Sequence, residues 1–193
     1  MHRTRFRITA PLLACALSVV VSNEAQGQLK AGASGRATSV VTLSQPRVQG
    51  QPAPKGLIIS LDYGVPVARG RAVAGVLADD VGKVWRLGAN EATAFRTDVD
   101  LDIGGVMVPK GTYTLFAETT KGAWTLIVNK KTGQWGTEYD KSMDLARIPL
   151  KERTLVTPVE SHTMWLIPTA DAAKGELRFA WGTLEHSVAW TAK

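Results

Sequence analysis

Hydrophobic and polar residues alternate along most of the chain after residue 56. Every odd position from 57 to 63 is Leu, Ile or Tyr, and the same spacing recurs in 95–103, 112–118, 124–128 and 177–181. A period of two is typical of a β-strand with one buried face. We therefore expect strands in these segments, including one unbroken strand over 95–103.

Glycine, proline and asparagine separate the alternating segments. Gly104-Gly105 stands between two such segments, and both residues tolerate the positive φ angles of a tight hairpin. Helical spacing is absent apart from a short turn expected near 140–145. Many short strands joined by tight turns are typical of an antiparallel β-sandwich or a flattened barrel. The sequence therefore predicts an all-β fold with a single domain after a signal peptide.

The N-terminal residues 1–27 have the pattern of a secretory signal peptide. Arg3, Arg5 and Arg7 precede an apolar run, which is followed by the small residues Ala25-Gln26-Gly27. The apolar run is too short to span a membrane comfortably, so no transmembrane helix is expected. Cys15 ends a loose lipoprotein-like box, which leaves a lipid anchor as the less favoured alternative. We expect an exported protein, periplasmic or extracellular, cleaved after Gly27.

Two further regions follow the signal peptide. Residues 28–56 combine a flexible leader, a first strand at 36–43 and a loop rich in proline and glycine. Residues 57–193 form the β-sandwich domain. Cys15 is the only cysteine, so a mature chain cut after Gly27 has neither a disulfide nor a thiolate metal site.

The formal net charge of +6 is a modest excess, and basic residues form no long cluster. This pattern does not indicate a nucleic-acid partner. Without cysteines, His162 and His186 could hold a metal only with help from carboxylates, and His186 lies on the apolar row of its strand, which is typical of a core histidine. Neither a metal nor another cofactor is therefore expected. Asp98, Asp100 and Asp102 would lie about 7 Å apart on one strand face, which favours a solvated face over a calcium site.

The candidate site lies in 62–93, where charged and aromatic residues stand among glycines without clear periodicity. Arg86 carries a rigid fork of donors that suits a carboxylate, and Glu91 or Asp62 could supply it. One interpretation is a buried pair that holds the loop between two strands. The other is a clamp for an anion or polar ligand, to which Asn90 and the Tyr63 hydroxyl contribute.

Tryptophan suggests a second kind of recognition, because an exposed indole face packs well against a sugar ring. Trp85 and Trp135 stand beside glycines in expected loops and are the candidates for exposure. Trp124, Trp181 and Trp190 fall on inward-facing rows, where packing in the core is the better interpretation.

Several short motifs together resemble an exported bacterial family of unknown function, DUF2911. They are Asp62-Tyr63-Gly64-x-Pro66, Gly82-Lys83-Val84-Trp85-Arg86, Gly88-Ala89-Asn90-Glu91-Ala92-Thr93 and Gln134-Trp135-Gly136. The similarity spans about Gly56 to the C-terminus. Val65 departs from the arginine common in the family, as do Asp79 and Asp80 from its proline and aromatic residue. The resemblance implies an exported β-rich domain and brings no catalytic residues.

These observations favour a non-catalytic β-sandwich that binds a small polar ligand, a glycan or an envelope partner. The predicted ligand-binding residues are Tyr63, Trp85, Arg86, Asn90, Glu91 and Trp135. One alternative is an exported hydrolase that uses Glu91 or Asp62 as acid or base beside Arg86. Another is a structural or assembly protein of the envelope that pairs through a sheet edge.

Overall fold

The computed structural model describes residues 34–73, 83–120, 122–170 and 173–193. The expected signal peptide over 1–27, with Cys15, lies outside the described residues, and so do Asp79 and Asp80. The description below concerns the compact unit Ala31–Lys193.

Antiparallel strands dominate the described residues, as the alternation predicts. The strands are β1 (Ser34–Leu43), β2 (Leu57–Pro66), β3 (Val84–Trp85), β4 (Thr93–Thr97), β5 (Leu101–Ile103), β6 (Val106–Val108), β7 (Gly111–Thr120), β8 (Ala123–Asn129), β9 (Asp144–Pro149), β10 (Lys151–Pro168) and β11 (Lys174–Ala192). A short 3-10 turn, η1 (Lys141–Met143), stands where the short helical turn was expected.

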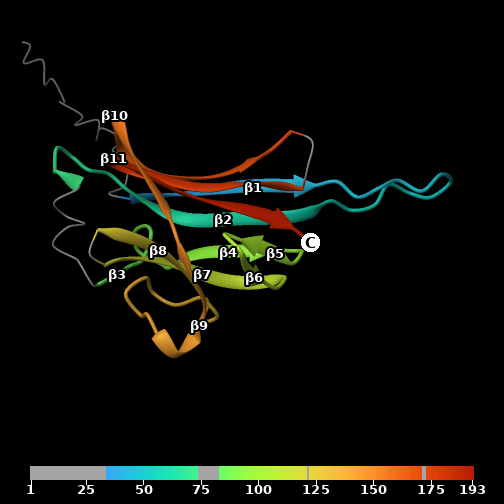
Figure 1. Ribbon diagram of the computed structural model, residues 1–193, viewed down its shortest axis with the longest axis horizontal. Helices are drawn as coiled ribbons and strands as arrows, with labels where there is room; N and C mark the ends of the chain where they lie inside the picture. The colour runs from blue at the N-terminus through green and yellow to red at the C-terminus, as the bar shows by residue number, and fades with distance from the viewer. Residues whose placement is uncertain (1–33, 74–82, 121, 171–172) are drawn as a thin grey trace, which may run out of the picture. The chain divides into compact units, whose positions relative to one another are not determined.

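The strands form two sheets (Figure 1). The larger sheet has the order β1-β2-β4-β7-β8-β9, and β3 joins it by pairing with the second half of β7. The smaller sheet has the order β10-β11-β5-β6. The Gly104-Gly105 hairpin between β5 and β6 is confirmed, with φ angles of 58° and 88° at the two glycines.

The main hydrophobic core takes side chains from both sheets, as a β-sandwich requires. The larger sheet contributes residues such as Ile59, Leu61 and Leu126, and the smaller sheet contributes Phe179 and Trp190. The sheets do not close into a barrel, so the sandwich is the form observed. Phe116 and Ile127 face the other way and build a small second cluster with Val84 and Tyr139.

The single strand expected over 95–103 is wrong. β4 ends at Thr97 in the larger sheet, and β5 begins at Leu101 in the smaller one. Asp98 lies at the crossing, where its carboxylate accepts a hydrogen bond from the Ile58 N–H at 3.0 Å. This bond and the pairing with Arg96 lower the pKa of Asp98 below its ordinary value. The alternation continues through the crossing because both sheets face one core.

The other two aspartates of this segment also have local roles. Asp100 accepts a hydrogen bond from the Lys110 N–H at 2.7 Å, and Asp102 accepts one from the Gly105 N–H at 2.8 Å. The three carboxylates therefore cap backbone donors around the crossing and the hairpin, rather than sharing one solvated strand face.

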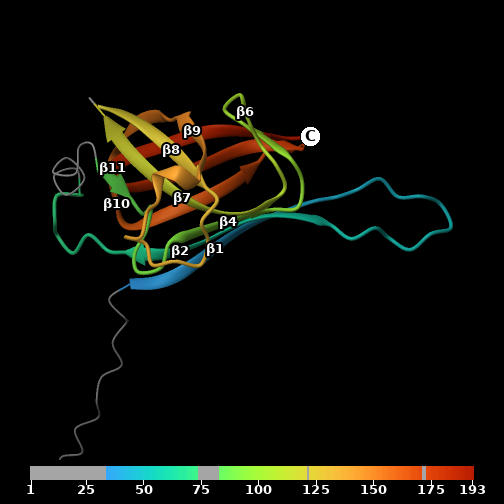
Figure 2. The ribbon, with the colours of Figure 1, turned by 90° about the horizontal axis from the view of Figure 1, so that it is seen from below.

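β1 pairs with β2 along its whole length, from Ser34 opposite Pro66 to Leu43 opposite Leu57. The residues before the proline-rich loop thus belong to the larger sheet. The loop itself, residues 44–56, extends away from the strands in both ribbon views (Figures 1 and 2).

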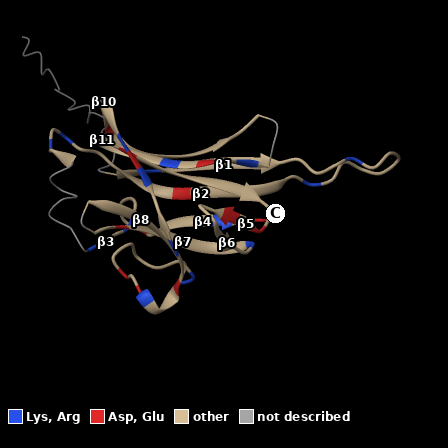
Figure 3. Cartoon of the chain, viewed as in Figure 1, with Lys and Arg blue, Asp and Glu red and all other residues tan. Residues whose placement is uncertain are grey.

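Basic and acidic residues are interspersed along the strands and loops (Figure 3). Among the described residues, no helix is long and apolar enough to cross a membrane.

Candidate functional site

Three segments that are distant in sequence meet at one end of the larger sheet. They are the end of β2 at Gly64, the loop 86–92 after β3, and the loop 134–136. Glycines allow the contact. A Cβ on Gly64 would overlap the carbonyl oxygen of Ala89, and one on Gly136 would lie 2.7 Å from the Asn90 oxygen and against the Arg86 side chain. The glycines of the motifs therefore serve close backbone approach.

Backbone hydrogen bonds join the two loops. The Gly136 N–H donates to the Asn90 oxygen at 3.0 Å, and the Ala92 N–H donates to the Gln134 oxygen at 3.2 Å. Glu91 and Trp135 form an antiparallel bridge between them. Asn90 has a φ of 65°, a left-handed conformation that asparagine tolerates better than most residues. This explains an asparagine at that point of the loop.

His162 supports the loop from the opposite sheet. Leu87 also has a positive φ, 49°, and its carbonyl accepts the Thr93 hydroxyl at 2.8 Å. The same oxygen lies 3.2 Å from Nε2 of His162, which must carry the proton to donate there. Burial lowers the pKa of His162 to about 4, so the ring is neutral at neutral pH. Nothing in the sequence indicates this hydrogen bond between His162 and the loop.

Trp85 forms the inner wall of the site. Its indole lies 5.0 Å from the His162 ring in an edge-on arrangement and 6.1 Å from Trp181 in a nearly parallel one. It is half-buried, so the structure gives Trp85 less exposure than the loop position suggested. Trp124, Trp181 and Trp190 are buried, as predicted.

A cavity of about 460 Å³ opens where these segments meet. This volume lies within the range of sites for small organic ligands. Three of the predicted ligand-binding residues line it: Trp85, Arg86 and Asn90. The other described lining residues are Ser34, Pro66, Arg71, Lys83, Val84, Gly88, Ala89, Gly136, Thr137, Tyr139 and Trp181.

The described lining residues include three basic side chains, Arg71, Lys83 and Arg86, and no acidic one. Arg71 donates from Nε to the Ala68 oxygen at 2.9 Å and from Nη2 to the Val67 oxygen at 3.0 Å, which fixes its guanidinium without a carboxylate. Tyr139 also lines the cavity, and its hydroxyl donates to Asp144 at 2.6 Å. Burial and the neighbouring Asp144 raise the pKa of Tyr139 to about 12.

The expected pair between Arg86 and Glu91 or Asp62 is wrong. Arg36 of β1 takes both carboxylates instead, through Nε to Asp62 at 2.8 Å and through Nη1 to Glu91 at 2.7 Å. Arg36 was missed because nothing in the sequence shows that β1 pairs beside Asp62 in β2. The Asp62 and Glu91 side chains are 47% and 57% exposed. Neither carboxylate is among the described residues that line the cavity.

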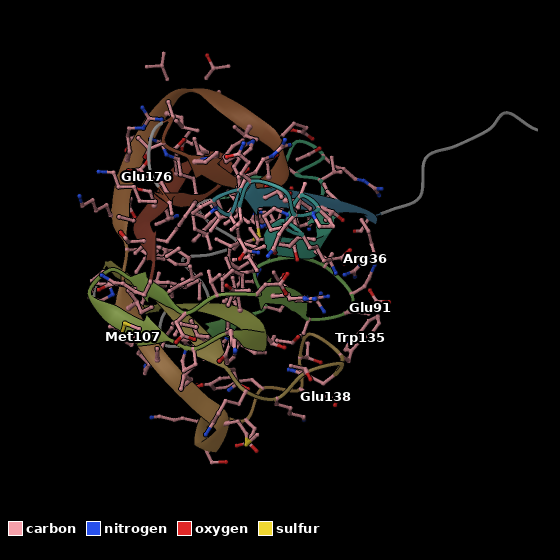
Figure 4. All side chains as sticks on the ribbon, turned by 90° about the vertical axis from the view of Figure 1, so that its right-hand side faces the viewer. Arg36, Glu91, Met107, Trp135, Glu138 and Glu176 are labelled. Carbon is pink, nitrogen blue, oxygen red and sulfur yellow. The ribbon has the colours of Figure 1, made fainter. Side chains whose placement is uncertain are left out.

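The remaining two predicted residues also lie outside the cavity lining. Tyr63 is buried, and its hydroxyl accepts a hydrogen bond from the Met164 N–H at 3.0 Å. Trp135 is 46% exposed and lies with Arg36 and Glu91 on one side of the molecule (Figure 4). The structure thus divides the predicted set into a cavity group, a buried structural tyrosine and an exposed surface group.

Metal ligands do not gather in this region. Within the described ranges, no group of three or more histidine, cysteine, aspartate or glutamate side chains could hold a metal ion. His186 lies 3.2 Å from Glu152 and packs on Phe179 and Trp124, away from the cavity lining.

The fold and the site together define a β-sandwich with a basic, aromatic-walled cavity at one end of its larger sheet. The chain belongs to the DUF2911 family, described as a protein of unknown function, whose model matches residues 36–189. The suspected membership is thereby confirmed, and the match begins in β1 rather than near Gly56. No curated protein and no solved structure matches the chain significantly.

Proposed function

We propose that this protein is a non-catalytic binding module that takes a small polar ligand in the cavity beside Trp85, Arg86 and Asn90. One observation carries the proposal: the three motif segments converge on a single cavity of about 460 Å³. Loop residues with positive φ and glycines in close contact hold that cavity open in a fixed form, which lowers the entropic cost of binding.

The test is a screen for binding with the mature chain, read by calorimetry. The screen covers small polar metabolites and short oligosaccharides, because Trp85 and Trp181 line the cavity and an indole face packs well against a sugar ring. Thr137 is exposed and lines the cavity, so Thr137→Phe should block it and abolish binding. Thr132→Phe is the matched control, since Thr132 is exposed in the same loop and is not among the lining residues. Binding that survives Thr137→Phe would contradict the proposal.

We also propose that the protein is exported, to the periplasm or beyond the cell. The support is the basic, apolar and small-residue pattern of residues 1–27. Mass spectrometry of the protein from a periplasmic fraction should find an N-terminus at Gln28. An intact N-terminus in the cytosolic fraction would contradict export, and a lipid on Cys15 would replace the soluble form by an anchored one.

A further inference from the structure

We propose that the ligand of this cavity carries an anionic group, a carboxylate or a phosphate, and that Arg86 is the residue that binds it. This inference rests on the proposed function and narrows its ligand to one chemical class.

The first observation is that the Arg86 guanidinium has no polar partner among the described residues. The residue lines the cavity and is half-buried. Its side chain forms no ion pair or hydrogen bond with any residue that the structure describes, whereas the nearby Asp62 and Glu91 are both bound by Arg36. A guanidinium that is partly removed from water gains most from a bidentate oxyanion. A carboxylate or phosphate in the cavity would supply that partner.

The second observation is that the Arg86 side chain is held in place before any ligand arrives. Its Cβ and Cδ atoms lie against Gly136, at a point where a methyl group on the glycine would not fit. Gly136 is tied in turn to Asn90 by the 3.0 Å backbone hydrogen bond. A fixed stem leaves less side-chain freedom to lose on binding, which favours affinity.

The third observation is the balance of charge around the cavity. Arg71 adds a second guanidinium, which backbone carbonyls orient and which no carboxylate of the described residues neutralises. The described part of the lining holds no Asp or Glu. Such a wall attracts anions and excludes cations.

The aromatic residues of the cavity indicate that the anionic group belongs to a larger organic molecule. Trp85, Trp181 and Tyr139 line the same cavity as Arg86. A bare inorganic ion would leave these walls uncovered, whereas an organic anion with a planar or apolar body would cover them. The ligand class is therefore an organic carboxylate or phosphate.

Isothermal calorimetry with three matched probes tests this inference: benzoate, phenyl phosphate and neutral benzamide. We expect at least one anionic probe to bind about tenfold more tightly than benzamide, and comparison of the two anions identifies the preferred group. Arg86→Gln should abolish the preference. Arg96→Gln is the control, because Arg96 is exposed, pairs with Asp98 and is not among the cavity-lining residues. Urea unfolding of both variants checks that each is folded.

The outcomes separate the two proposals. Equal affinity for benzamide and the anions, or a preference for anions that survives Arg86→Gln, would overturn the role of Arg86. If benzamide or an oligosaccharide binds and Thr137→Phe abolishes that binding, the cavity is a binding site but its ligand is not an anion. If none of the probes and none of the screened compounds bind, both proposals fail.

Discussion

The hydroxyl of Tyr63 in β2 accepts a hydrogen bond from the backbone N–H of Met164 in β10, and so links the two sheets at 3.0 Å. Two residues further along β10, the Leu166 N–H donates to the Ser39 hydroxyl of β1 at 2.9 Å. Side chains of the larger sheet therefore satisfy outward-facing donors on the edge of the smaller sheet. This protects a strand edge that would otherwise be open to pairing with another chain.

Tyr63→Phe should lower the free energy of unfolding by about 1–2 kcal/mol, because the Met164 N–H becomes a buried donor without a partner. Urea unfolding followed by tryptophan fluorescence measures the change. Tyr113→Phe is the matched control: its hydroxyl donates to the Pro109 carbonyl at 2.8 Å, and Pro109 is exposed, so water can replace the bond. An equal loss in both variants would argue against a special role for the cross-sheet bond.

Gly64→Ala should destabilise the protein by about 3 kcal/mol or more, because the added methyl group overlaps the Ala89 carbonyl and the backbone must move. Gly35→Ala offers a control on the neighbouring strand. A Cβ at Gly35 has no atom within 4 Å, so its effect should stay within about 0.5 kcal/mol. Chemical unfolding compares the two. Similar values for both variants would show that Gly64 is not a steric requirement.

Arg86→Gln and Glu91→Gln should each change the free energy of unfolding by about 1 kcal/mol at most. Arg86 has no ion-pair partner among the described residues, and the Glu91 pair with Arg36 is exposed to solvent. Urea unfolding checks both variants. If both variants lost about 3–5 kcal/mol in the free energy of unfolding, the interpretation of a buried pair between Arg86 and Glu91 would be favoured instead.

Stability should fall as the pH drops from about 6.5 to about 4. Burial lowers the pKa of His162 in the folded state, so the unfolded chain binds the proton first. The contribution of neutral His162 is fully present above pH 6.5 and is lost as the pH falls toward 4, with a total of about 3 kcal/mol. Urea midpoints at about pH 7 and about pH 5 measure the slope.

His162→Gln is the variant that checks this origin, since its amide can donate to the Leu87 carbonyl without titrating. It should flatten the pH dependence between these limits. His186, whose pKa burial also lowers, and at the acid end Asp98, whose pKa hydrogen bonds lower, contribute to the slope that remains. An unchanged slope in His162→Gln would assign the effect to other groups.

The alternation of residues sufficed to predict the strands, because one buried face per strand leaves a period of two. It could not show that β4 and β5 belong to different sheets, since the inward positions stay apolar on both sides of Asp98. Sheet membership depends on long-range pairing, which a local pattern does not encode.

The candidate site was predictable only where its residues are close together in the sequence. Trp85, Arg86 and Asn90 are close in sequence and remain together at the cavity. Arg36 reaches the region because β1 pairs with β2, and His162 reaches it from β10 of the other sheet. Neither relationship can be read from the local sequence. The sequence therefore indicated a local cluster whose members meet at the cavity, but it could not show that Arg36, and not Arg86, pairs with Asp62 and Glu91.

The crossings between the sheets have a consequence for how the protein unfolds. Only residues 98–100 separate β4 from β5, and only Leu150 separates β9 from β10, while each pair divides between the two sheets. With connections this short, one sheet cannot separate from the other without straining both. Amide hydrogens in β7 and β11 should therefore exchange with solvent through the same global opening, so that the two layers behave as one cooperative unit.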